Sequence, residues 1–377
     1  MAIDPLATSD PAELTARLAL AAADAAALGL DAVVVTPGTD MTYLCGYVAL
    51  PLERLTALII TPGESPKMVV PLLEQPAAVA AGVEDLGIVV AAWEETEDPY
   101  SLVADLIPGA HRIAVNDAML ARAAFGLRDA MPLASLELAG PVIGELRMRK
   151  TAAEVAALQE AGAAIDWVHA HVAELLRPGV TEREVATRIA DLILDSGHAT
   201  VDFVIVASGP NGASPHHEVS DRILEVGDPV VVDIGGTMPS GYCSDSTRTY
   251  SLGEPPAAFR QAFDVLVTAQ AAAVAHVRPG VTCESVDAAA RDILSAAGLG
   301  DAFIHRTGHG IGLETHEEPY IVSGNVLALE PGFAFSIEPG FYLAGRFGAR
   351  IEDIVVCDSD GVVNCNNRPR ELVVVDV

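Results

Sequence analysis

An internal repeat in the second half of the 377-residue chain constrains its fold more than any other feature. Residues 177–181 read RPGVT, and the same five residues return at 278–282, an offset of 101 residues. Each copy follows a long alanine-rich helical pattern and starts a second predicted helix, over 184–194 and 285–296. Each then leads through a strand and a Gly-rich loop to a predicted hairpin that carries carboxylates. A duplicated helix–helix–hairpin unit predicts two halves about a pseudo-twofold axis, with their hairpins side by side.

Both predicted hairpins contain acidic residues inside or directly after apolar strand patterns. Asp233 follows three valines, and Asp245 begins the return segment after the next turn. Glu338 follows a second apolar run, and Glu352 lies in the return segment beyond a turn at Gly345. If each segment folds as a hairpin, its two carboxylates face one another across the strands.

The segment between the hairpins supplies an imidazole, since His309 stands in the sequence GHGIG. Carboxylates buried together without partners would each cost several kcal/mol and would repel one another. Two divalent ions would supply the positive charge that these carboxylates need. Four oxygen donors and one imidazole suit manganese, cobalt, zinc or iron, whereas a site without thiolates is not typical of a structural zinc centre. The sequence therefore predicts a metal site with the ligands Asp233, Asp245, His309, Glu338 and Glu352.

The composition narrows the class of protein and its partners. Lys and Arg number 22 against 52 Asp and Glu, a formal net charge of −30, which argues against nucleic acid and anionic membranes as partners. The five cysteines have no C-x-x-C spacing, so we expect reduced thiols and a cytoplasmic location. No apolar run reaches the length of a membrane span.

The first third of the chain has the pattern of a separate α/β domain. A boundary precedes a long amphipathic helix predicted over 150–176, which opens with a capping box of Thr151 and Glu154. We therefore predict two domains, 1–145 and 146–377. Short strand patterns of the first domain lie at 32–35, 55–60 and 68–70.

Five sequence blocks resemble a known enzyme family. In chain order they read VVVDIGG, GYCSDSTRTY, HRTGHGIGLETHEEPYI, SIEPG and RIEDIVV. Together they resemble the metallopeptidase family of prolidase, Xaa-Pro aminopeptidase and methionine aminopeptidase. The resemblance implies an α/β (α+β) class, with a pita-bread catalytic domain of internal pseudo-twofold symmetry. The preceding region is similar to the small N-terminal domain of prolidases and creatinase, which favours the prolidase branch because methionine aminopeptidases usually lack it.

The resemblance also implies a role for each ligand. Asp233 is similar to the bidentate ligand of one metal, and His309 and Glu338 are similar to ligands of the other. Asp245 and Glu352 match the two bridging carboxylates. The implied cofactor is a pair of divalent ions per chain, with Mn²⁺ favoured and Co²⁺ or Zn²⁺ as alternatives.

Further residues match the family's substrate-facing set. His216 matches the family histidine, with His217 at the adjacent and less fixed position. His316 would bind the peptide carbonyl or stabilise the tetrahedral oxyanion, and His305 would lie near the leaving residue. Glu338 would carry a proton to the leaving proline nitrogen. The implied catalytic residues are His216, His305, His316, Glu338 and Arg350.

The function implied by the resemblance is a cytoplasmic, homodimeric metallopeptidase that hydrolyses Xaa-Pro dipeptides. Its partner would be a small peptide, with neither nucleic acid nor membrane. One alternative is an Xaa-Pro aminopeptidase that acts on longer peptides. Two others are a metal-free creatinase-like hydrolase and a non-catalytic peptide-binding module. Both of these should lack some of the five ligands, and the presence of all five counts against them.

Overall fold

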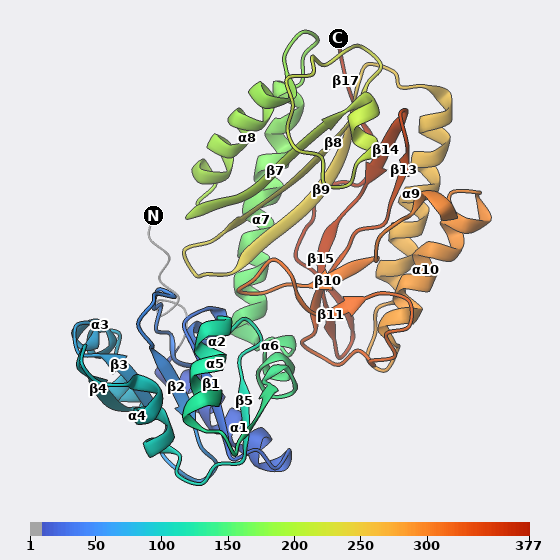
Figure 1. Ribbon diagram of the computed structural model, residues 1–377. Coiled ribbons are helices and arrows are strands. Elements are labelled where there is room, and N and C mark those ends of the chain that lie inside the picture. The colour runs from blue at the N-terminus through green and yellow to red at the C-terminus, as the bar shows by residue number, and fades with distance from the viewer. Residues whose placement is uncertain (1–9) are drawn as a thin grey trace. The chain divides into compact units, whose positions relative to one another are not determined.

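The computed structural model describes residues 10–377, which divide into two compact units. The N-terminal unit ends at Arg147 and the second unit begins at Met148 (Figure 1). Within residues 10–377, none of the helices combines the length and the apolar character that a membrane span requires. All five cysteines are free and buried.

The N-terminal unit is built around a six-stranded mixed sheet. The helix α1 (Pro11–Ala27) begins where the Asp10 side chain accepts a hydrogen bond from the Ala12 N–H, with proline in its first turn. The sheet has the order β4-β3-β2-β1-β5-β6. Its strands are β1 (Ala32–Val35), β2 (Ala57–Ile60), β3 (Lys67–Pro71), β4 (Val89–Trp93), β5 (Arg112–Val115) and β6 (Ser135–Leu138). The other helices of this part are α2 (Thr39–Cys45), α3 (Gln75–Ala80), α4 (Pro99–Leu106) and α5 (Ala121–Ala130), and the short α6 (Glu145–Met148) crosses the boundary between the units.

The first half of the second unit packs two helices against a four-stranded sheet. The predicted capping box is confirmed, because the Thr151 and Glu154 side chains each bond the other residue's backbone N–H. Apolar side chains of both helices and of the sheet share one buried core. The elements are α7 (Ala152–Leu175), α8 (Glu182–Asp195), β7 (Thr200–Ser208), β8 (Pro229–Thr237) and β9 (Cys243–Leu252), with β17 (Val373–Val375) added parallel to β9.

The second half repeats this plan. A second core joins two helices to a five-stranded sheet of order β11-β10-β12-β15-β16 and to the ribbon β13–β14. The helices are α9 (Ala257–His276) and α10 (Cys283–Ala296). The strands are β10 (Gly308–Gly310), β11 (Glu317–Ile321), β12 (Ala334–Ile337), β13 (Gly340–Leu343), β14 (Phe347–Arg350), β15 (Asp353–Asp358) and β16 (Gly361–Asn364).

The sequence repeat corresponds to a repeat in the structure. Thr181 and Thr282 end the two RPGVT copies, and each caps the helix that follows, α8 or α10. Each threonine also forms an isolated antiparallel bridge, Thr181 to Ile223 and Thr282 to Ala328. Equivalent helices and bridges in the two halves agree with the predicted duplication.

The two hairpins differ in register. In the first, Asp233 pairs with Thr247 while Asp245 pairs with Gly235, so the two carboxylates are diagonal neighbours and not direct partners. The second hairpin runs from β12–β13 through a turn at Gly345 to β14–β15. We predicted Glu352 within a continuous return strand, but the structure breaks that strand at residues 351–352. Glu338 and Glu352 therefore lie opposite one another, each at a break between two strands.

Candidate metal centre and active site

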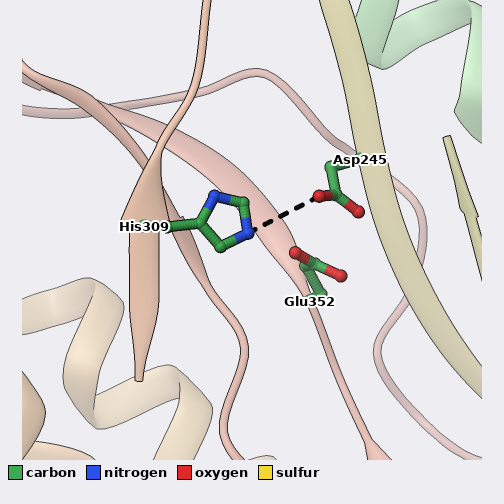
Figure 2. Close-up of side chains that lie close together, drawn as sticks. All are labelled: Asp245, His309 and Glu352. Carbon is green, nitrogen blue, oxygen red and sulfur yellow. Dashed lines mark ion pairs between the residues drawn. The ribbon is translucent and has the colours of Figure 1, made fainter. Parts of the chain in front are cut away.

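Three of the predicted ligands lie close together in the structure. One ligand atom each from Asp245, His309 and Glu352 lies within 4.8 Å of the other two, and all three residues are buried. Figure 2 shows the two carboxylates facing the imidazole from different segments of the chain. The His309 Nε2 atom lies 3.6 Å from Asp245 Oδ2 and 3.3 Å from Glu338 Oε1, so a fourth predicted ligand joins the group.

His309 has the protonation state that a metal ligand requires. Burial lowers the pKa of His309 to about 3, so its imidazole is neutral at pH 7 and its close approaches to carboxylates are not salt bridges. Its Nδ1 atom lies 3.1 Å from the Gly310 carbonyl oxygen, which can only accept a hydrogen bond. The proton therefore belongs on Nδ1, and the Nε2 lone pair faces the carboxylates.

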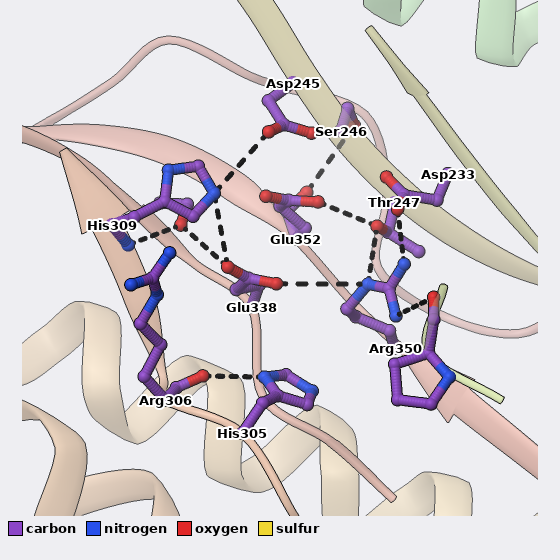
Figure 3. Close-up of polar contacts among 12 residues, drawn as sticks. Asp233, Asp245, Ser246, Thr247, His305, Arg306, His309, Glu338, Arg350 and Glu352 are labelled. Carbon is purple, nitrogen blue, oxygen red and sulfur yellow. Dashed lines mark hydrogen bonds and ion pairs between the residues drawn. The ribbon is translucent and has the colours of Figure 1, made fainter. Parts of the chain in front are cut away.

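The fifth predicted ligand, Asp233, lies at the same site. One of its oxygens accepts a hydrogen bond from the Arg350 guanidinium (Figure 3), whereas its Oδ1 atom is buried without a hydrogen-bond partner. Glu352 is similar, since Oε2 accepts from Thr247 Oγ1 at 2.7 Å while Oε1 is buried and unpartnered. Buried oxygens without partners are uncommon in proteins, and these two are where a bound cation would supply the missing contact.

The electrostatics of the site also favour the binding of cations. Burial raises the pKa of Asp245 well above its usual value, and the charge of Glu352 adds to the rise. Burial likewise raises the pKa of Glu352, with Glu338 adding to the effect. The pKa of Glu338 rises to about 7 for the same first reason, although Arg350 opposes the rise. Divalent cations would relieve both the burial cost and the mutual repulsion, so this donor set fits metal ions.

Arg350 is a buried basic residue beside these carboxylates. Besides Asp233, it donates from Nε to Thr247 Oγ1 at 3.0 Å and from NH1 to the Tyr342 hydroxyl at 2.7 Å. Its Nε lies 4.0 Å from Glu338 Oε2. Arg350 therefore orients an acid from each hairpin (Figure 3). Its NH1 group also reaches the Pro215 carbonyl at 3.4 Å, which fixes the loop that carries His216 at the site.

The predicted histidines lie around this centre. The His316 ring is exposed, and its centroid lies 4.0 Å from that of His309. His305 Nδ1 lies 2.7 Å from the Arg306 carbonyl oxygen, and its Nε2 lies 2.9 Å from the Tyr342 hydroxyl. Burial lowers the pKa of His305 to about 4, with Arg350 contributing, so this ring is neutral.

Two adjacent histidines have different surroundings in the structure. His217 Nε2 lies 2.9 Å from Glu182 Oε2, whereas His216 is exposed. Glu182 is fully buried and also accepts hydrogen bonds from Ser208 and Ser220. Burial alone would raise the pKa of Glu182, but these hydrogen bonds outweigh it and lower the pKa. His217 is thus hydrogen-bonded within the framework of the loop, whereas the His216 side chain is open to solvent.

The sequence analysis missed three residues of the site: Thr247, Tyr342 and Glu182. Thr247 could have been found, because it alternates with Asp245 on β9 and so shares its face of the strand. Tyr342 links Arg350 to His305, and Glu182 accepts hydrogen bonds from residues on both sides of His216. The Tyr342–Arg350 contact lies within one hairpin, but the contacts of Tyr342 with His305 and of Glu182 with His217 join segments 37 and 35 residues apart, for which the sequence has no local signal.

The glycines around His309 are required by close packing. An added Cβ at Gly308 would lie 1.8 Å from the Ser336 carbonyl oxygen, and one at Gly310 would lie 2.1 Å from the Glu318 carbonyl oxygen. The Ser336 hydroxyl also accepts a hydrogen bond from the His309 N–H at 3.0 Å. The GHG motif therefore lets β10 lie tightly between β11 and β12 and aims the imidazole into the site.

Fold and site together define a two-domain metallopeptidase. Residues 156–359 match the model of metallopeptidase family M24, and residues 17–149 match that of the creatinase/prolidase N-terminal domain. The chain belongs to metallopeptidase family M24, and the family resemblance seen in the sequence is confirmed. Membership implies divalent metal ions, in agreement with the donor set.

Named relatives cover almost the whole chain. The probable dipeptidase PepE of Mycobacterium tuberculosis is 55% identical over 362 residues, 96% of each chain. An Xaa-Pro dipeptidase of Lactobacillus delbrueckii subsp. lactis is 37% identical, over 93% of this chain and 96% of its own. The crystal structure of dipeptidase PepE from Mycobacterium ulcerans superimposes with a TM-score of 0.95 at 54% identity, covering 98% of this chain and 100% of that one. The crystal structure of a prolidase from Thermococcus sibiricus superimposes with a TM-score of 0.87 at 38% identity, covering 95% of this chain and 98% of that one.

Proposed function

We propose that this peptidase hydrolyses Xaa-Pro dipeptides. The observation that carries the proposal is the convergence of four acidic residues and a neutral histidine at one buried centre. The similarity to a dipeptidase and to an Xaa-Pro dipeptidase over more than nine-tenths of the chain supports the substrate class. The complete ligand set counts against a metal-free hydrolase and against a non-catalytic binding module.

The site would hold two divalent cations, with Mn²⁺ favoured. We assign Asp233 to one ion, His309 and Glu338 to the other, and Asp245 and Glu352 to both. The unpartnered oxygens of Asp233 and Glu352 support this assignment. When bound, such ions bring the pKa of coordinated water toward neutrality and polarise the scissile carbonyl.

The chain's own side chains would orient the peptide and move its protons. Glu338 receives a hydrogen bond from Ser336 at Oε1 and faces Arg350 with Oε2, so its carboxylate is held in one orientation. We assign it the proton that reaches the leaving proline nitrogen. His316 would donate to the oxyanion from beside His309. His216 would contact the peptide carbonyl.

Proline explains why a dedicated enzyme is needed. Its nitrogen has no N–H once it is acylated, and its ring fixes φ, so a site built for extended hydrogen-bonded strands binds it poorly. A pocket shaped to the ring gains apolar contact of roughly 1–3 kcal/mol, which corresponds to about 10–200-fold discrimination. We favour dipeptides over longer peptides because the relatives at 55% and 37% identity are named dipeptidases.

The proposal also includes features of the protein's setting. We propose a homodimer in the cytoplasm, with neither nucleic acid nor membrane as a partner. The acidic composition, with a formal net charge of −30, and the five free cysteines support this setting. Sedimentation of the purified protein would measure the oligomeric state directly.

The decisive experiment compares four substrates on Mn²⁺-loaded enzyme. We expect kcat/KM for Ala-Pro to exceed that for Ala-Ala by roughly 10–200-fold, and chelation to abolish both activities. Ala-Pro-Ala should be cleaved more slowly than Ala-Pro, and Met-Ala no faster than Ala-Ala. Equal turnover of Ala-Pro and Ala-Ala would contradict proline selectivity and leave a general dipeptidase. Faster turnover of Ala-Pro-Ala would favour the aminopeptidase.

A further inference from the structure

The backbone of Glu352 is held in an unusual way. Glu352 lies in the gap between β14, which ends at Arg350, and β15, which begins at Asp353. The backbone N–H and C=O groups of Glu352 therefore form their hydrogen bonds with residues outside that hairpin. The Glu352 N–H donates to the Thr247 carbonyl at 3.1 Å, and the Glu352 carbonyl accepts from Arg248 NH1 at 2.6 Å. A strand of the other half, β9, thus fixes this residue.

Arg248 reaches several groups at once. It lies on β9, next to Thr247, and its side chain is 4% exposed. From NH2 it donates to Asp353 Oδ1 at 2.6 Å, so it holds the residues on both sides of the Glu352–Asp353 peptide bond. The planar guanidinium with its five donors permits these contacts in fixed directions, which an ammonium group does not.

The C-terminal segment completes this arrangement. Arg248 also donates to the carbonyl oxygens of Pro369 and Arg368, at 2.9 and 2.8 Å. Arg370 in turn donates to Asp353 Oδ2 at 2.5 Å. The segment 366–370 is anchored on its other side, where the Asn366 side chain accepts from the Ile354 N–H at 2.8 Å.

Asp353 has its own positively charged partners, separate from the metal centre. Asp353 is fully buried beside Glu352, but two arginines and the Gln270 amide, 3.0 Å from Oδ2, satisfy it. An unpaired carboxylate here would add to the repulsion among the ligands. The ion pairs therefore neutralise the charge of Asp353, so that it does not add to the charge of the carboxylates proposed to bind the cations.

We propose that Arg248, Asp353 and residues 366–370 form a clamp that positions Glu352 for metal binding. The clamp rests on the proposed dinuclear site and goes beyond it, because none of its members is a predicted ligand. Its role is positioning: it sets the backbone of a ligand that has no ladder partner of its own. Outer groups that orient a ligand typically change metal affinity when they are altered.

The test measures Mn²⁺ binding to the metal-stripped, full-length protein by titration calorimetry. Arg248→Lys keeps the charge but loses the fork that spans Glu352, Asp353 and the C-terminal segment. We expect it to weaken Mn²⁺ binding by roughly 10–100-fold. The matched control is Arg260→Lys, which alters an exposed pair with Glu254 and should leave the affinity within about threefold. Mn²⁺ electron paramagnetic resonance should also show a weaker spin coupling in Arg248→Lys, because the bridging ligand is displaced.

Asp353→Asn and the wild-type protein provide two further tests of the clamp. If Arg248→Lys does not fold, Asp353→Asn replaces it, since it removes the charge that holds the guanidinium and should also weaken Mn²⁺ binding. A folded Arg248→Lys or Asp353→Asn with unchanged Mn²⁺ affinity and unchanged spin coupling would reduce the clamp to an ordinary structural ion pair. Wild-type protein that binds none of Mn²⁺, Co²⁺ and Zn²⁺ would instead overturn the proposed dinuclear site, so the two failures are distinguishable.

Discussion

Asp233 and Glu338 occupy equivalent positions in the two halves of the second unit. Each lies ten residues beyond the residue that bridges a helix-capping threonine, Ile223 in the first half and Ala328 in the second. Each also follows a buried apolar strand segment, within β8 or at the end of β12. A duplicated unit thus delivers one carboxylate from each half to the same centre.

Neutralising one ligand should change stability in opposite directions with and without metal. In metal-free protein, Asp245→Asn removes a buried charge that its neighbours repel, so we expect a melting temperature about 2–4 °C higher for each kcal/mol relieved. With saturating Mn²⁺ the wild type should be the more stable, because it binds the ions more tightly. Calorimetry with chelator and with Mn²⁺ measures both.

The control for this prediction is Asp191→Asn on α8, where the carboxylate is exposed. It should shift neither melting temperature appreciably. If Asp245→Asn destabilised the metal-free protein, the idea that these acids repel one another in the absence of cations would be wrong.

The order of the elements and the acidic residues that converge at the candidate metal centre could be predicted from sequence, because both have local signals. The RPGVT repeat marks two helix starts, and the acids inside apolar runs mark the two hairpins. Adding the offset of 101 residues to Asp233 gives Ala334, four residues before Glu338. The bridges show why, since the second half has four more residues between its capping threonine and Ala328 than the first half has before Ile223.

Other features could not be predicted because they depend on register and long-range contact. The diagonal relation of Asp233 and Asp245 follows from a turn geometry that the residues alone do not specify. The hydrogen bond from Thr247 to Glu352 joins β9 of one half to the break between β14 and β15 of the other, 105 residues apart. Such pairings appear only once the two hairpins are packed side by side.

The adjacent histidines should behave differently when truncated. We expect His216→Ala to lower kcat/KM by roughly 10²-fold, as for loss of a group that contacts the transition state, with little change in stability because its side chain is exposed. His217→Ala leaves the buried Glu182 short of a donor and should lower the free energy of unfolding by about 1–3 kcal/mol. Steady-state kinetics and urea unfolding of both variants measure these effects. If His217→Ala lowered kcat/KM and His216→Ala lowered the stability, the two assignments would have to be exchanged.

A single methyl group should disrupt the strand that carries His309. In Gly308→Ala the new Cβ would lie 1.8 Å from a backbone oxygen of β12, so the strand must move. We expect a loss of more than about 2 kcal/mol of stability, together with reduced Mn²⁺ content. Gly144→Ala is the control, because its Cβ meets nothing within 4 Å. Soluble Gly308→Ala protein with wild-type metal content and melting temperature would contradict the packing argument.

The last prediction concerns the pH dependence of stability. His169 is fully buried, and burial lowers its pKa to about 3, against about 6.5 in an unfolded chain. Between these values the unfolded state binds the extra proton, so the stability that neutral His169 provides is complete above about pH 6.5 and declines as the pH falls toward 3. The slope is about 1.4 kcal/mol per pH unit, so wild type should lose about 2 kcal/mol more than His169→Gln between pH 7.5 and 5.0. The imidazole lies 3.0 Å from the Tyr250 hydroxyl and 3.1 Å from the Ser246 carbonyl, and the glutamine amide can replace one of these contacts without titrating.

Urea unfolding of the wild type and His169→Gln with chelator present, followed by circular dichroism, measures the difference in free energy of unfolding. An equal loss in the two proteins would show that His169 is not the group that senses pH.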